Sequence, residues 1–478
     1  MILLIRGIFA MKTEEALLDF IMSTRYSHLP GEVVITVKRQ IMNTFAAMLC
    51  GSAASGTKEL AELVRSWGGK GESTVFLQTF KAPVHDAVLV NATMARALDF
   101  DDFHMQTGMH ASATVVPTAL AIAEATGGIN GESFITAIAL GGETLCRMRL
   151  VPDHCIGISG WTGEIYGAFG AVVTAGKLCG LSREKMRDAL GLAYSQAAGS
   201  SQTIYDGAMA TRLQQGFSAR AGCVSTAMAS AGLTGARNFL EGKAGLYPVY
   251  YRGLGYDIGR LTEGMGKKYE IMNIATKPYP CCGFTMAPIE NIIQIMAKNQ
   301  IESSDIERIE VYVNQKMYNT VCLPIDRKYQ PQTPADAMFS LPYVVATAAL
   351  HRDVVLEDFA TDLISEPRRI EYAKKIKTVV DHEIDKEATA SNIPLGLHRI
   401  DVYTRDGKKY SNLLRYATGF PEKPMTPEEC FLKAKKCASF ALKSSDTKRI
   451  EMVKTLVDKL EEEKNLSVLI ELIHSFVR

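Results

Sequence analysis

The stretch "VHDAVLVNATMARAL", residues 84–98, decides the fold class of this chain. Its apolar side chains fill most of the circumference of a helix: Val84, Ala87, Val88, Val90, Ala92 and Met94. A helix that is apolar on most sides is usually enclosed by other helices. The stretch therefore predicts a buried helix inside a helical core.

Helical patterns continue on both sides of this stretch, from about residue 14 to about residue 250. They cover residues 33–53, 112–128, 131–148, 164–180, 183–200 and 216–235. Pro117 falls near the start of the second pattern, and Gly127-Gly128 ends it. Alanine, glycine and serine are abundant throughout, and small residues let helix backbones approach closely. We therefore expect a tightly packed helical domain over residues 1–270.

The pattern changes after about residue 270. Residues 306–318 and 398–410 alternate apolar and polar side chains and are rich in β-branched and aromatic residues, which predicts strands. Residues 333–353 and 367–380, between them, have helical patterns. We expect a mostly α protein with a smaller α+β domain over residues 271–424. Residues 425–478 return to helix and are predicted to rejoin the first domain.

Composition excludes several classes of function. The 478 residues are 47% hydrophobic and 22% charged, with a formal net charge of +1, so no charge excess favours nucleic acid or an anionic membrane. No run of about 20 uncharged apolar residues predicts a membrane span. Arg6 interrupts the apolar start, and no signal-peptide cleavage site is evident. The ten cysteines lack zinc-type spacing, so we expect buried thiols and a cytoplasmic protein.

The segment "ALDFDDFHMQTGMH", residues 97–110, crowds acids and imidazoles between two apolar helical patterns. If the preceding helix continued through it, Asp101 and His104 would share one face. Carboxylates beside an imidazole can tune it for general acid/base work near neutral pH. Capping of a helix end is the main alternative, since Asp and His also satisfy free backbone groups. A metal site is the weaker alternative, because no second ligand cluster appears in the sequence.

Three further segments carry candidate residues. Arg212 and Arg220 lie among small and apolar residues, where an arginine binds either a substrate carboxylate or an internal acid. Lys277 precedes Pro278-Tyr279-Pro280, which either aims the lysine and tyrosine at a ligand or forms a linker with a solvated lysine. Trp161 lies in a glycine-containing segment that suits either a ligand-binding loop or ordinary helix packing.

Taken in order, these segments resemble the MmgE/PrpD family, which includes 2-methylcitrate dehydratase, cis-aconitate decarboxylase and iminodisuccinate epimerase. The resemblance spans roughly residues 90–345. It is carried by "ALDFDDFHMQTGMHASATVVPTALAIAE", "GEIYGAFGAVVTAGKLCGLS", "MATRLQQGFSARAG", "GLTGARNFLEGKAGLY", "KPYPCCG" and "TPADAMFSLPYVVA". The first and third segments, with "WTGEIYGA" and "PCCG", look nearest to the fungal type of cis-aconitate decarboxylase.

The resemblance implies a large helical domain with a smaller α+β lid domain inserted before the C-terminal tail. It also implies a homodimer that works without a metal or organic cofactor. Family members move a proton at a carbon next to a carboxylate, in decarboxylation, dehydration or epimerisation. The expected function is therefore that of a lyase acting on a small di- or tricarboxylate. The alternatives are an epimerase of a small dicarboxylate and a catalytically silent, ligand-binding relative.

Site residues carry over from the resemblance only in part. The resemblance implies catalytic roles for Asp99, His110 and Lys277, with Asp102 as a second candidate partner of His110 and His104 close by. A lid tyrosine aligns loosely with Tyr318. We expect Arg212 and Lys277 to hold substrate carboxylates, because an unpaired buried carboxylate is costly.

Three departures from the family pattern concern charge. Trp161 or Thr162 stands where relatives carry a pocket histidine, Thr211 replaces a pocket lysine, and Met286 replaces a further histidine. Trp161, Thr211 and Tyr279 are thus expected to line the substrate site without adding positive charge. We therefore expect a substrate with fewer carboxylates, or one with a bulky apolar group near Trp161.

Overall fold

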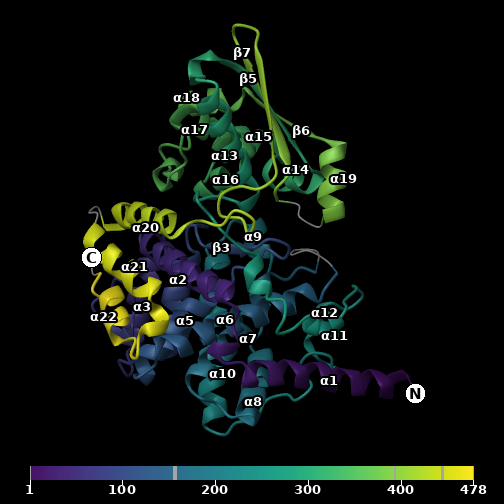
Figure 1. The fold of residues 1–478 in the computed structure, drawn as a ribbon, viewed down its shortest axis with the longest axis vertical. Coiled ribbons are helices and arrows are strands. Elements are labelled where there is room, and N and C mark those ends of the chain that lie inside the picture. Colours follow the sequence, from purple (N-terminus) through teal and green to yellow (C-terminus); the bar gives the residue numbers. More distant parts are fainter. Residues whose placement is uncertain (1, 154–158, 392–394, 443–445, 477–478) are drawn as a thin grey trace. The chain divides into compact units, whose positions relative to one another are not determined.

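The computed structural model describes residues 2–153, 159–391, 395–442 and 446–476, and the described chain is mostly α-helical (Figure 1). It divides into two compact units. The larger unit contains residues 1–274 and 426–478, and the smaller unit contains residues 275–425. The second piece of the larger unit therefore follows the whole of the smaller unit in the sequence.

The larger unit is built around long helices joined by short turns. Its helices are α1 (Ile2–Ser23), α2 (Gly31–Gly51), α3 (Thr57–Trp67), α4 (Val84–Arg96), α5 (Ala111–Thr126), α6 (Gly131–Leu150), α7 (Gly167–Leu178), α8 (Arg183–Tyr194), α9 (Gln202–Tyr205), α10 (Ala210–Ser230), α11 (Leu246–Tyr250), α12 (Gly259–Thr262), α20 (Pro427–Leu442), α21 (Thr447–Asp458) and α22 (Ser467–His474). The strands β1 (Ser73–Thr74), β2 (Lys81–Ala82) and β3 (Asp102–His104) are short, and β4 (Ile274–Thr276) spans the boundary between the units.

Helix α4 is the buried helix that the sequence predicted. Every residue from Asp86 to Ala95 is buried, and α2, α5 and α10 pack against it. Small residues permit this packing, because a Cβ atom on Gly51 of α2 or on Gly216 of α10 would collide with a backbone carbonyl oxygen of α4. The yellow C-terminal helices lie beside α2, which α20 contacts along its length (Figure 1).

Residues 97–110 do not continue helix α4, so the condition under which Asp101 and His104 would share a helix face is not met. The helix ends at Arg96, and Asp99 adopts a left-handed backbone with φ of 52°. Aspartate tolerates this conformation better than most residues. The chain then forms β3 and reaches His110, the residue immediately before α5.

The smaller unit contains a four-stranded sheet with strand order β6-β5-β7-β8. Its strands are β5 (Ile306–Val313), β6 (Ile376–Val380), β7 (His398–Thr404) and β8 (Lys409–Leu414). Its helices are α13 (Gly283–Lys298), α14 (Gln315–Val321), α15 (Ile325–Tyr329), α16 (Pro334–Met338), α17 (Leu341–His351), α18 (Pro367–Ala373) and α19 (His382–Ser391). Helices α13 and α17 pack against each other and against the sheet (Figure 1).

Two sequence predictions in this unit need correction. The predicted strand over residues 306–318 stops at Val313, and residues 315–321 form α14. The predicted helix over residues 367–380 is a helix only to Ala373, and residues 376–380 form β6, which pairs in parallel with β5. Residues 398–410 contain the predicted strand and then turn back at Gly407 to begin β8.

Two other sequence expectations have counterparts in the structure. Among the described residues, no helix combines the length and the apolar character needed to cross a lipid bilayer. All of the described cysteines except Cys179 are buried, and Cys155 lies outside the described residues.

Candidate active site

The candidate site of the larger unit begins with an arginine at the end of α4. Nη1 of Arg96 lies 2.6 Å from Oδ1 of Asp99 and 3.7 Å from Oδ1 of Asp101. Burial alone would lower the pKa of Arg96, but Asp99, Asp101 and Glu164 outweigh it and the net shift is upward. Arg96 therefore remains charged and neutralises part of the acidic segment.

His110 forms the most chemically suggestive contact of the segment. Its Nδ1 lies 2.9 Å from Oδ2 of Asp101, a carboxylate that is fully buried. The imidazole itself keeps 16% of its side-chain surface exposed. A carboxylate at this position keeps the proton on Nδ1 and leaves Nε2 as the acid/base nitrogen. None of the described residues hydrogen-bonds to Nε2.

The partner of His110 differs from the one that the sequence analysis expected. We expected Asp99 or Asp102 to orient the imidazole, but Asp101 makes the contact. Asp99, whose backbone is left-handed, lies three residues after the end of α4 and pairs with Arg96 instead.

Asp102 begins strand β3, and its side chain contacts the first turn of helix α5. Its Oδ1 accepts a long hydrogen bond of 3.4 Å from the backbone N–H of Ser112. Burial and the negative charge of Asp101 raise the pKa of Asp102 to about 6, although Ser112 and His110 oppose the rise. A carboxyl group with a pKa this close to neutrality can exchange a proton under physiological conditions.

His104 has a different environment from His110. It is fully buried, its Nδ1 accepts a hydrogen bond of 3.3 Å from the Thr107 N–H, and its Nε2 lies 3.6 Å from Glu270. Burial would raise the pKa of Glu270, but His104, Lys268 and Asn273 outweigh it and lower that pKa to about 2. These contacts give His104 a structural role in holding strand β3.

Helix α10 supplies the other wall of the site. Nε2 of Gln215 donates a 2.8 Å hydrogen bond to the backbone oxygen of His110. One turn earlier, Nη1 of Arg212 donates a 3.3 Å hydrogen bond to the Ser55 carbonyl oxygen. Burial and the charge of Arg96 lower the pKa of Arg212. Among the described residues, no carboxylate pairs with Arg212, so it can receive an external anion.

Thr162, at the position where the sequence resemblance led us to expect a pocket histidine, is an uncharged residue. Oγ1 of Thr162 donates a 2.6 Å hydrogen bond to Oε1 of Gln214, on α10. A Cβ atom on Gly163 would meet Sδ of Met109, the residue before His110, so this side chain would have to shift to admit any other residue at position 163. This segment, which begins the 3-10 helix η2 (Gly163–Tyr166), therefore lies against the acidic loop.

The two remaining predicted site residues of the larger unit make few polar contacts. The ring of Trp161 packs edge-on against Tyr250, with ring centroids 4.6 Å apart. Thr211 is half-buried in the first turn of α10. Neither residue adds charge to the site.

Lys277, Tyr279 and Tyr318 belong to the smaller unit. Lys277 is buried, so the alternative of a solvated linker lysine was wrong. Burial, with Glu290 and Asp353, raises the pKa of Tyr279, which therefore stays a neutral phenol at physiological pH. Tyr318 is half-buried on α14.

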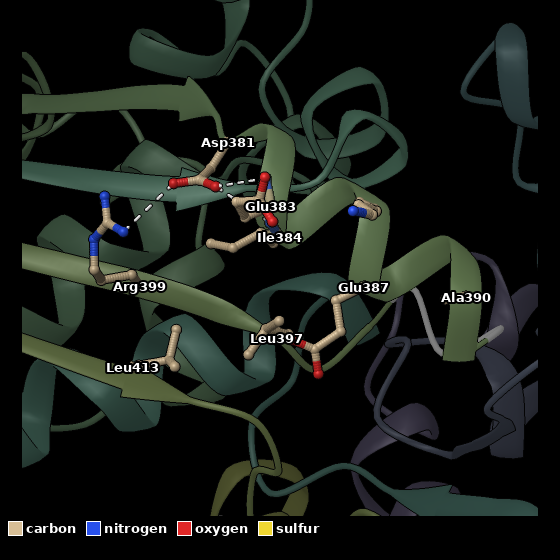
Figure 2. A pocket seen from close by; sticks show the side chains of 9 residues that line it. Asp381, Glu383, Ile384, Glu387, Ala390, Leu397, Arg399 and Leu413 are labelled. Atoms are coloured by element: carbon tan, nitrogen blue, oxygen red, sulfur yellow. Dashed lines mark hydrogen bonds and ion pairs between the residues drawn. The ribbon is translucent and has the colours of Figure 1, made fainter.

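The smaller unit also has a pocket of about 420 Å³ between α19 and the strands β7 and β8 (Figure 2). Asp381 accepts hydrogen bonds from the first turn of α19 and pairs with Arg399 at 3.4 Å. Glu387 on its wall pairs with Arg415. None of the predicted site residues lines this pocket, and these charges already have partners.

The donor atoms of Asp99, Asp101 and His110 lie within 4.8 Å of one another, a spacing that would suit a metal ion. Arg96 already brings positive charge to both carboxylates, and the Asp101–His110 hydrogen bond uses two of the donor atoms. We therefore interpret the group as an ion-pair and hydrogen-bond network.

Sequence reasoning missed several residues of this network. Arg96 and Gln215 occupy ordinary helical positions, and neither pattern nor composition distinguishes them. The only signal was the presence of an arginine in the otherwise apolar stretch "NATMARAL". Asp101 was visible in the acidic segment, but its role depends on the turn at Asp99.

Most of the chain is similar to proteins of one known family. Residues 15–258 match the MmgE/PrpD N-terminal domain, and residues 279–459 match the MmgE/PrpD C-terminal domain. Cis-aconitate decarboxylase from Aspergillus terreus is 25% identical over 94% of this chain and 93% of the relative. A cis-aconitate decarboxylase-like protein from Aspergillus oryzae is 24% identical over 96% of both chains. Cis-aconitate decarboxylase from Mus musculus is 24% identical over 96% of this chain and 93% of the relative.

Proposed function

This chain belongs to the MmgE/PrpD family, and from that premise we propose that it is a lyase acting on a small carboxylate. The reaction is a decarboxylation or dehydration by proton transfer next to a carboxylate group. The relatives named as cis-aconitate decarboxylases favour decarboxylation. We propose that the reaction needs no metal or organic cofactor.

The observation that carries this proposal is the 2.9 Å contact between Nδ1 of His110 and buried Asp101. In a decarboxylation, the carbon–carboxylate bond breaks, carbon dioxide leaves, and the electron pair stays on the carbon and is delocalised toward a second carboxylate. His110 begins this step as the imidazolium, with a proton on each ring nitrogen. His110 then delivers a proton from Nε2 to the carbon and becomes neutral. In a dehydration, the same nitrogen removes the proton and an acid protonates the leaving hydroxyl; Asp102 is the candidate acid, because its raised pKa allows it to carry a proton.

The charges of the site bear on the substrate. Arg96 is balanced by Asp99 and Asp101, whereas Arg212 has no carboxylate partner among the described residues. Thr162 and Thr211 add no charge at the two positions where the sequence resemblance implied a histidine and a lysine. We therefore propose that the larger unit binds one substrate carboxylate through Arg212 and that the substrate is a dicarboxylate rather than a tricarboxylate.

Lys277 is the second proposed cation. Lys277 is buried, and an ammonium group shielded from bulk water can bind a substrate carboxylate through a charge-assisted hydrogen bond. We propose that Lys277 contributes to the same reaction, so Lys277→Met is expected to lower kcat/KM by about tenfold or more. Unchanged turnover in a folded Lys277→Met variant would remove it from the mechanism.

The test is product analysis by NMR in D2O with a panel of small di- and tricarboxylates. Deuterium in the product identifies the carbon that receives the proton. Turnover of cis-aconitate as fast as the best dicarboxylate would contradict the substrate proposal. A chelator treatment that abolished turnover, restored by a divalent ion, would contradict the proposal of a metal-independent reaction.

The variant His110→Asn distinguishes an enzyme from a silent ligand-binding relative. We expect it to lose turnover and to keep the parent's thermal unfolding temperature within a few degrees, since His110 is partly exposed. Unchanged turnover would remove His110 from its role. Absence of turnover across the panel in the parent protein, with retained carboxylate binding, would support the silent relative.

A further inference from the structure

The C-terminal helix α20 brings a buried lysine to the acidic segment of the candidate site. Lys433 keeps only 4% of its surface exposed. Its Nζ donates a 2.7 Å hydrogen bond to the backbone oxygen of Phe100 and a 2.6 Å hydrogen bond to Oδ1 of Asn43, on α2. The ammonium nitrogen also lies 3.8 Å from the centroid of the Phe100 ring.

Phe100 directly precedes Asp101, so the position of its carbonyl group affects the Asp101 side chain. It stands between Asp99, whose backbone is left-handed, and Asp101, whose carboxylate holds His110. A bound carbonyl oxygen fixes the peptide plane between Phe100 and Asp101, and with it the direction in which the Asp101 side chain leaves the backbone. The ammonium group of Lys433 thus acts one residue away from the hydrogen bond that orients the imidazole.

The hydrogen bond from Lys433 to the Phe100 oxygen forms although burial of the lysine ammonium group is unfavourable. Burial lowers the pKa of Lys433 to about 8, while Asp101 and three cysteine thiols oppose the shift. Moving an ammonium group out of water is unfavourable unless hydrogen bonds and nearby charges compensate. The Phe100 oxygen, Asn43 and the nearby Asp101 carboxylate supply that compensation.

We propose that Lys433 is a positioning residue for the proton-transfer step: its ammonium group holds the Phe100 carbonyl and thereby sets the Asp101 carboxylate that orients His110. The inference rests on the proposed function, because it assigns Lys433 to the same His110–Asp101 pair. Lys433 itself is not a catalytic residue, since its described contacts are all with the protein.

The test compares Lys433→Met with a matched variant, Lys177→Met. Lys177, on α7, is a half-buried lysine whose Nζ also donates to two backbone carbonyls, those of Ile21 and Thr24, at 3.0 and 3.1 Å. We expect Lys433→Met to lower kcat roughly ten- to hundredfold with a much smaller change in KM, because misplacement of an acid/base affects the chemical step. Lys177→Met is expected to leave both constants unchanged.

A double-mutant cycle separates positioning from general damage. If Lys433 acts through His110, Lys433→Met lowers turnover in the parent protein but has no further effect on the residual turnover of His110→Ala. Equal losses in both backgrounds would overturn the proposal. Loss of turnover in Lys433→Met but not in His110→Ala would instead contradict the role of His110, and with it the proposed function.

A spectroscopic measurement tests the same inference without turnover. In protein labelled with ¹⁵N-histidine, the Nδ1–H signal of His110 is identified by its absence in His110→Ala, among the nine histidines of the chain. We expect Lys433→Met to shift or broaden that signal and Lys177→Met to leave it unchanged. Lys433→Gln keeps a neutral donor toward the Phe100 oxygen and is expected to change the signal less. An unchanged signal in Lys433→Met would overturn the proposal.

Discussion

Replacing Asp101 by asparagine is the most direct test of the candidate site. Asp101 is fully buried, and its two oxygens lie 2.9 Å from Nδ1 of His110 and 3.7 Å from Nη1 of Arg96. Asparagine keeps the size of the side chain but removes its charge. Its amide can also donate a hydrogen bond to Nδ1, which would favour a neutral imidazole with its proton on Nε2. That form has no basic lone pair on Nε2, and it is a much weaker acid than the imidazolium that the Asp101 carboxylate stabilises.

The magnitude follows from the bond that is lost. A hydrogen bond to a charged group contributes about 1.5–3 kcal/mol, and about 1.4 kcal/mol corresponds to a tenfold change in rate. Asp101→Asn should therefore lower kcat by roughly 10- to 150-fold. KM should change little, because Asp101 lies behind the imidazole rather than in contact with substrate. The assay is steady-state turnover of the best carboxylate of the panel, with the thermal unfolding temperature measured on the same samples.

The matched control is Asp86→Asn. Asp86 is also a buried carboxylate of the larger unit, with an imidazole at 3.4 Å (His85) and a guanidinium at 3.1 Å (Arg220). We expect a comparable loss of stability in the control and unchanged kcat. The reasoning is refuted if folded Asp101→Asn keeps its kcat within about threefold of the parent, a change well below that of one charged hydrogen bond.

Three further outcomes are expected. The folded state holds the Asp102 proton up to about pH 6, whereas the unfolded chain releases it near 3.8, so the free energy of unfolding should fall as pH rises from 4 to 6. In Asp102→Asn, this fall in the free energy of unfolding should be smaller by up to about 3 kcal/mol, as measured by urea unfolding at several pH values. If the free energy of unfolding changes with pH in the same way in parent and variant, the prediction is contradicted. Arg212→Met should raise KM by about tenfold or more with little effect on stability, and Arg220→Met, whose partner is Asp86, should leave KM unchanged. Gly216→Ala should lower the free energy of unfolding by about 1–3 kcal/mol, because the new Cβ atom would meet the Leu89 carbonyl oxygen. An unchanged midpoint of urea unfolding would show that α10 and α4 can move apart to admit the methyl group.

The parts of the fold that were predictable from the sequence are those governed by local patterns. The buried helix at residues 84–96 and the end of α5 before Gly127 follow from apolar periodicity and glycine placement. Strand β6 was missed because residues 376–380 follow a charged helical pattern, and their strand partner, β5, lies more than 60 residues earlier in the chain.

Some residues of the candidate site were likewise predictable from the sequence, and others were not. His110 and the acidic segment were visible as residue types, since imidazole and carboxylate chemistry is readable from sequence. The choice of Asp101 over Asp99 was not, because it depends on one left-handed residue that reverses which side chain faces the imidazole. Lys433 was not predictable either, because its contact joins positions 333 residues apart.

That separation has a consequence for how the protein is made. At translation rates of about 5–20 residues per second, the ribosome adds Lys433 to the chain roughly 20–70 s after Phe100. During that interval the nascent chain already carries His110 and Asp101, but the helix that secures their loop does not yet exist. The larger unit is complete only when residues 426–478 join it. Maturation of the site therefore waits for the synthesis of α20, and a chain that terminates before α20 would carry the acid/base pair without the lysine that holds it in place.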